Sequence, residues 1–218
     1  PKYKDWESVV GIKFIYLPFG ISLERFNHLN LDRKYDFGFS GGLHKSHTDL
    51  RYLVKKQIFK SSSIDQKSNF GLSSFLKPNP FKSEYSKYKI FWAEWGAKNY
   101  NYRSLLPSGD KYKFLLNNCK VFLNTPSAIG IFNTRFFELM ATKTLIFCPK
   151  SELYNNILKD QYNCLMFNPD MSDFDYLFNQ AVNNSKLRDS ITINAINDVS
   201  SHSYDNRIKS LIKIIKNA

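Results

Sequence analysis

Five short runs of apolar residues are spread along the chain, and longer, more polar segments separate each run from the next. The runs have the length of strands and are rich in aromatic and branched side chains, which favours buried strands over helices. They lie at residues 35–39, 89–95, 120–123, 144–148 and 164–167. A sixth run, 11–18, predicts a strand that ends at a proline turn. Strands that alternate with helices predict an α/β protein whose parallel sheet is covered by helices on both faces.

Helices are expected where a capping residue precedes apolar residues spaced three to four positions apart. Thr48 or Asp49 can cap a helix that continues through Phe59, and Ser108 can cap one that continues through Asn117. Further helices are expected after Ser172 and at residues 135–142, 151–158 and 185–199. The polar segments 61–86 and 96–107 are predicted to be loops.

The last predicted helix has one apolar face, with lysines on the opposite side. The apolar face consists of Tyr204, Ile208, Leu211, Ile212 and Ile215. Such a helix is expected to pack against the domain through this face. The alternative is a helix that lies on a membrane surface.

Residues 119–149 hold the most informative pattern. Two strands flank a loop with proline, serine and glycine and a helix that Asn133 or Thr134 can cap. Free N–H groups and the helix dipole attract an anion at the start of such a helix, at the carboxyl edge of the sheet. Arg135 can add a guanidinium to a phosphate there, and Glu138 can accept hydrogen bonds from a ribose diol. The alternative is that Arg135 and Glu138 form an ordinary surface pair three residues apart.

This stretch resembles the donor-site motif of the GT-B glycosyltransferases, and most closely that of the group-1 type, in the branch that includes spore-maturation-like transferases. The resemblance is carried by Ser127, Gly130, Thr134, Arg135, Phe137, Glu138, Met140, Ala141, Thr142 and Thr144. It implies a single, Rossmann-like donor lobe in which the helix start, with Gly130, Thr134 and Arg135, meets the diphosphate of a nucleotide sugar. It further implies that Glu138 binds the ribose. Many members carry a second glutamate that touches the donor sugar where this chain has Gly130.

The loop after the first core strand is expected at the same sheet edge. Residues 40–42, Ser-Gly-Gly, are predicted to turn the chain, and the resemblance places Gly41 and Gly42 beside the donor phosphates. Lys45 is a candidate phosphate contact, and His44 is a candidate catalytic residue. Together with Lys45, Arg135 would stabilise the departing diphosphate, which makes Arg135 the second candidate catalytic residue.

A third loop, 96–107, is also expected at this edge. Tyr100, Tyr102 and Arg103 are the candidates for flanking a nucleobase. The alternative is a surface loop that buried tyrosines hold in place.

Composition and charge fit a folded, basic protein of 218 residues. Hydrophobic residues make up 43% of the chain, enough for a sizeable core. The net charge of +12 implies an anionic partner such as a nucleotide, a nucleic acid or a membrane surface. Because the lysines are scattered, no nucleic-acid partner is expected. No apolar run approaches the ~20 residues of a membrane span, so a cytoplasmic protein, at most peripheral to a membrane, is expected.

Neither a metal site nor a cofactor is predicted. Cys119, Cys148 and Cys164 lie in or beside apolar runs without C-x-x-C spacing, which is typical of reduced, buried thiols. Asp173 and Asp175 match a D-x-D motif, but they occupy the first turn of a predicted helix, where carboxylates complement the helix dipole.

Residues 1–33 are expected to lead in, as a segment or hinge, from a possible N-terminal acceptor lobe, and residues 34–218 to form the nucleotide-sugar-binding domain with its C-terminal helix. The expected function is metal-independent transfer of a sugar from a UDP- or GDP-linked donor to a glycan or other acceptor. One alternative is a non-catalytic basic domain that binds nucleotides or nucleic acid. Another is a structural lobe of a larger assembly.

Overall fold

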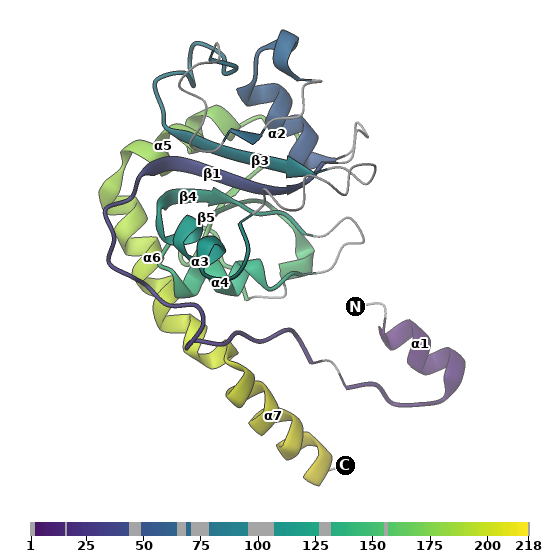
Figure 1. Ribbon diagram of the computed structural model, residues 1–218. Coiled ribbons are helices and arrows are strands. Elements are labelled where there is room, and N and C mark those ends of the chain that lie inside the picture. The colour runs from purple at the N-terminus through teal and green to yellow at the C-terminus, as the bar shows by residue number, and fades with distance from the viewer. Residues whose placement is uncertain are drawn as a thin grey trace.

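The computed structural model describes residues 3–15, 17–43, 49–64, 69–70, 79–95, 107–126, 132–154 and 157–217. Its strands form one sheet in the order β2-β3-β1-β4-β5-β6 (Figure 1). Their bounds are β1 Tyr35–Gly42, β2 Asn69–Phe70, β3 Ile90–Trp95, β4 Cys119–Leu123, β5 Leu145–Pro149 and β6 Leu165–Phe167. Only β2, at the edge, is antiparallel to its neighbour; the five other strands are parallel, as predicted.

Helices cover both faces of the sheet (Figure 1). Their bounds are α1 Tyr3–Val10, α2 Leu50–Ile58, α3 Gly109–Asn117, α4 Arg135–Ala141, α5 Phe174–Asn183, α6 Ser185–Val199 and α7 Tyr204–Lys216, with 3-10 turns at Ser61–Ser63, Glu152–Tyr154 and Ser200–His202. Residues of α2 and α5 pack in one core, residues of α3 and α4 pack in the other, and α6 contributes to both. The predicted Rossmann-like α/β architecture is confirmed.

Two cores form because successive residues of a strand point to opposite faces of the sheet. In β4, Val121 and Leu123 enter the core under α2 and α5, whereas Phe122 enters the core under α3 and α4. Gly38 in β1 lets the strands pack closely, since a Cβ atom there would lie 2.6 Å from the Cys119 sulfur. The three cysteines are free and buried, as predicted, and burial raises the pKa of the Cys119 thiol.

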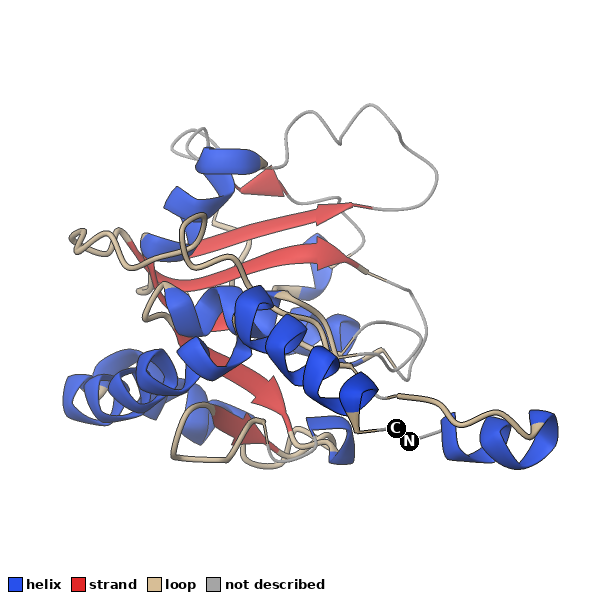
Figure 2. Ribbon diagram, turned by 90° about the horizontal axis from the view of Figure 1, so that it is seen from below, coloured by secondary structure: helices blue, strands red, loops and turns tan. Residues whose placement is uncertain are grey.

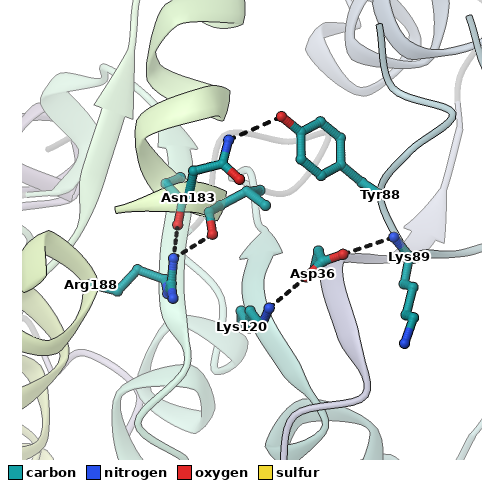
Figure 3. Close-up of polar contacts among 8 residues, drawn as sticks. Asp36, Tyr88, Lys89, Lys120, Asn183 and Arg188 are labelled. Carbon is teal, nitrogen blue, oxygen red and sulfur yellow. Dashed lines mark hydrogen bonds and ion pairs between the residues drawn. The ribbon is translucent and has the colours of Figure 1, made fainter. Parts of the chain in front are cut away.

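Figure 3 shows how polar contacts join the elements at the amino edge of the sheet. Asp36 of β1 accepts a hydrogen bond from the Lys120 ammonium, at 2.7 Å, and one from the Lys89 N–H, at 2.9 Å. The Arg188 guanidinium of α6 donates to main-chain oxygens at the end of α5. The Tyr88 hydroxyl accepts from the Asn183 amide at 3.0 Å. Side chains therefore tie the elements at this edge of the sheet together.

Four local predictions are wrong. The predicted loop 61–86 contains a strand, β2, which pairs with β3 at the edge of the sheet. The described residues within 11–18 form no strand and are largely exposed, because the sheet offers this segment no partner strand. The chain does not turn at 40–42, because β1 continues through Gly42, which pairs with Trp95 of β3. Helix was predicted at 151–158, but its described residues form only the turn Glu152–Tyr154.

The last helix forms as predicted, but its expected packing is wrong. No residue of α7 is buried, and Figures 1 and 2 show α7 and the N-terminal segment leaving the domain from the same place. A parallel bridge between Ile21 and Ser203 joins the two segments there. Of the eighteen large hydrophobic side chains exposed in the described part of the chain, twelve lie in these segments: Val9, Val10, Ile12, Phe14, Ile15, Leu17, Phe19, Tyr204, Ile208, Ile212, Ile214 and Ile215. The apolar face of α7 is present, but the residues that the structure describes do not bury it.

The described residues hold neither a membrane-spanning helix nor a cluster of metal ligands. None of the helices there has the length and apolar character needed to cross a membrane. No group of three potential His, Cys, Asp or Glu metal ligands occurs there either. Asp173 and Asp175 lie at the start of α5, as predicted, and accept hydrogen bonds from Asn168 and from Gln57 and Tyr85.

Candidate functional site at the carboxyl edge

A cavity of about 550 Å³ opens at the carboxyl end of β1, beside the starts of α3 and α4. In the sheet, β2 and β3 lie on one side of β1, and the later strands β4, β5 and β6 lie on its other side. Such a reversal of strand order opens a crevice beyond the strand ends, where parallel α/β sheets bind ligands. The cavity is lined by Arg25, Phe26, Ser40, Gly41, Arg51, Pro107, Ser108, Gly109, Tyr112, Asn133, Thr134, Arg135 and Glu138.

Arg135 begins helix α4, and its guanidinium reaches across to β1. One terminal nitrogen donates to the Ser40 carbonyl oxygen, and Nε donates to the Tyr112 hydroxyl at 2.7 Å. The guanidinium carbon also lies 5.6 Å from the centre of the Tyr112 ring. Strand β1 and helix α3 thus hold this positive charge at the cavity wall.

Glu138 lies one turn later and is partly buried. Its carboxylate accepts a hydrogen bond from the Tyr112 hydroxyl at 3.0 Å and one from the Thr134 hydroxyl at 3.3 Å. Within the part of the chain that the structure describes, Glu138 and Arg135 make no direct ion pair, so the surface-pair alternative is not what forms.

The predicted cap of α4 differs in detail. Thr134 occupies the N-cap position, but its hydroxyl makes no capping hydrogen bond and donates to Glu138 instead. The Asn133 side chain bonds Asn124 and the Thr125 carbonyl oxygen, which ties the helix start to the end of β4. The helix start is held by these loop contacts rather than by a side-chain cap.

A second guanidinium, that of Arg51, also lines the cavity. Arg51 lies in the first turn of α2, and its N–H donates to the carboxylate of the N-cap residue Asp49, as the sequence predicted for that cap. Its guanidinium donates to the Thr125 hydroxyl at 2.6 Å, the Gly42 carbonyl at 3.0 Å and the Pro126 carbonyl at 3.2 Å. Burial lowers the pKa of Arg51. The charge of Asp49 raises this pKa, and the charge of Arg135 lowers it.

Four of the predicted site residues line this one cavity: Gly41, Thr134, Arg135 and Glu138. Gly42 contributes its carbonyl oxygen, which holds Arg51. The other predicted residues, His44, Lys45, Gly130, Tyr100, Tyr102 and Arg103, lie outside the described residues.

Sequence reasoning did not assign Tyr112 or Arg25 to a site and did not include Arg51 among the binding residues. Arg51 had a usable signal, a cation in the first turn of the helix that follows the first core strand. Tyr112 had none, because an aromatic residue in a predicted helix is more often part of a core.

Comparisons with known proteins bear on the family and the fold of the chain. A family model described as "Glycosyl transferase-like" matches residues 73–213. The C-terminal domain of a group 1 glycosyl transferase family protein (LpcC) from Francisella tularensis has 13% identity and a TM-score of 0.53, covering 84% of this chain and 97% of that one. Anabaena HepE, in complex with UDP and glucose, has 11% identity and a TM-score of 0.58, covering 91% of this chain and 56% of that one.

The sucrose-phosphate synthase of Thermosynechococcus elongatus has 12% identity and a TM-score of 0.59, covering 100% of this chain and 56% of that one. This chain therefore spans a little over half the length of HepE and of the synthase. A comparison with curated protein sequences found no match. These structural likenesses establish the fold, and the family match covers well over half of the chain. The chain belongs to the glycosyl transferase-like family.

Proposed function

We propose that the cavity binds the nucleoside-diphosphate part of a donor sugar, and that the protein transfers this sugar to a glycan or other acceptor. The observation that supports this most strongly is the convergence of two guanidinium groups, of Arg51 and Arg135, and one carboxylate, of Glu138, on the same cavity. Two cations suit a diphosphate, and a carboxylate that already accepts from two hydroxyl groups suits a ribose diol.

In this arrangement the diphosphate lies between the carboxyl end of β1 and the start of α4. Arg51 and Arg135 face it, with Gly41 allowing close approach of the main chain and Thr134 beside the helix start. When the sugar leaves, negative charge builds up on the diphosphate, and fixed cations stabilise that charge without having to reorganise. His44, Lys45 and Gly130 stay proposed members of this site, and Tyr100, Tyr102 and Arg103 stay proposed neighbours of the base.

We propose that the reaction needs no cofactor and no bound metal, since arginine side chains supply the positive charge that a metal would otherwise bring. UDP is the favoured nucleotide, because HepE, of the same fold, is described with UDP. The alternative of a nucleic-acid-binding domain has less support, since the family model that matches this chain describes glycosyl transferase-like proteins.

A second lobe is the proposed partner of the apolar surface on α7 and residues 9–19, defined above by its exposed side chains. HepE and the synthase extend well beyond the region that this chain matches. Twelve exposed hydrophobic side chains gathered off one end of a domain are unusual unless another surface covers them. In a protein that contains both lobes, Ile208 and Ile212 should be shielded from solvent, which chemical labelling of α7 can measure; unchanged labelling would contradict the proposal.

Substitution of Glu138 by glutamine tests the ribose assignment. The amide keeps the size of the side chain and one acceptor, but it loses the charge and one of two equivalent oxygens. We expect affinity for UDP to fall by about 1–2 kcal/mol, with a smaller preference for UDP over 2′-deoxy-UDP, because the lost bonds go to the diol.

The measurement is a calorimetric titration of both proteins with both nucleotides. Glu138 also accepts from Thr134, so Thr134→Val serves as a control that removes the hydroxyl but keeps the carboxylate. Because Thr134 is proposed to lie beside the diphosphate, this variant should weaken binding of UDP and of 2′-deoxy-UDP equally and leave the discrimination between them unchanged. If glutamine leaves the discrimination between the two nucleotides unchanged, Glu138 does not bind ribose.

A further inference from the structure

The Tyr112 hydroxyl lies between two opposite charges. It accepts a hydrogen bond from Arg135 Nε at 2.7 Å and donates one to Glu138 Oε2 at 3.0 Å. Arg135 and Glu138 are three residues apart on α4, a spacing at which an arginine and a glutamate can pair directly. Both side chains instead bond to the phenol that enters between them from α3.

Packing and protonation fix the phenol in this role. Its ring meets the Phe26 ring edge-on, with centroids 6.1 Å apart, and the Arg135 guanidinium lies over it. Burial raises the pKa of Tyr112, so the hydroxyl keeps its proton at neutral pH. A phenol has one O–H to donate, and here it donates to the Glu138 carboxylate. A lone pair of the same oxygen accepts the hydrogen bond from Arg135.

We infer that Tyr112 is a positioning residue that keeps Arg135 and Glu138 apart, so that the guanidinium stays available to a diphosphate and the carboxylate to a ribose. The inference rests on the proposed function of the cavity. A direct ion pair would partly neutralise both groups, and a nucleotide would have to break the pair before either group could bind it.

Tyr112→Phe removes only the hydroxyl, and without it Arg135 and Glu138 are free to pair. We expect UDP affinity to fall about fivefold, the order of magnitude of one competing, partly exposed ion pair. In a Glu138→Gln background the same substitution should change affinity very little, because a neutral amide cannot neutralise Arg135. Calorimetric titration of the four proteins in this double-mutant cycle measures the difference.

Tyr88→Phe is the matched control. Tyr88 is also half-buried, and its hydroxyl also bonds a side chain, that of Asn183, but at the amino edge of the sheet (Figure 3). It should leave UDP affinity unchanged. Unfolding of ligand-free Tyr112→Phe should show that the fold is retained.

Two results of the titration would overturn the inference. One is an equal loss of UDP affinity in both backgrounds, which would mean that Tyr112 contacts the nucleotide itself. The other is no loss of UDP affinity at all. If the unsubstituted protein binds no UDP, the proposed function fails, and a ligand-free crystal structure of Tyr112→Phe still decides the inference. The inference expects a direct ion pair between Arg135 and Glu138 in that structure, and the two groups remaining apart would contradict it.

Discussion

Replacement of Lys55 by methionine is expected to lower the free energy of unfolding by about 3–5 kcal/mol. Lys55 of α2 is only 2% exposed, and its ammonium lies 2.7 Å from a carboxylate oxygen of Glu94, which is 8% exposed at the end of β3. The other oxygen of Glu94 accepts from the Trp92 indole at 3.2 Å. Removing the lysine leaves a buried carboxylate without its main counter-charge, and that loss is far larger than the loss of a surface ion pair.

Denaturant unfolding measures this effect. Lys56, the next residue of the same helix, is exposed and provides the matched control Lys56→Met, which should change stability by less than about 0.5 kcal/mol. The double variant Lys55→Met, Glu94→Leu should recover part of the lost stability, because it removes the buried carboxylate together with the lysine. Similar losses for Lys55→Met and Lys56→Met would show that burial of this pair does not matter.

Arg135→Ala should weaken binding of UDP by about 1.5–3 kcal/mol, or roughly 10- to 150-fold, and weaken binding of uridine much less. The guanidinium would make charge-assisted hydrogen bonds to the diphosphate, which uridine lacks. Calorimetric titration with both ligands measures the difference.

Arg188→Ala is the control for the change in net charge and for lost arginine–carbonyl bonds. Arg188 also donates to main-chain oxygens, but at the amino edge of the sheet (Figure 3). It should leave affinity for UDP unchanged. Equal losses of UDP and uridine binding in Arg135→Ala would show instead that Arg135 only supports the fold.

The strand–helix–strand unit around the cavity was predictable because its signals are local. The apolar runs that became β4 and β5 and the helix start at Arg135 follow from adjacent residues. The three-residue spacing of Arg135 and Glu138 placed both on one helix, and the motif suggested their chemistry. The contacts that complete the site are not local. Arg51 bonds Thr125 and Arg135 bonds Ser40, and these residues lie far apart in the sequence and meet only because of the order of the strands in the sheet.

The apolar pattern predicted the structure less reliably in segments that pack against no other described part of the chain. The apolar run at 11–18 has side chains typical of a strand, but a strand also needs a neighbouring strand to satisfy its N–H and C=O groups. The face of α7 was identified correctly, yet the pattern shows only that a surface is apolar and not what covers it. The buried pair of Lys55 and Glu94 was missed because a lysine in a helix is normally exposed.

Unfolding by heat in the presence of UDP tests the central claim, that this cavity binds a nucleoside diphosphate. At about 100 times its dissociation constant, UDP should add about 2.7 kcal/mol to the free energy of unfolding, with or without a metal chelator. The variant Arg135→Ala, Glu138→Gln should gain almost nothing at the same UDP concentration. Stabilisation that is absent from the unsubstituted protein, or equal in the two proteins, would contradict a nucleotide site in the cavity.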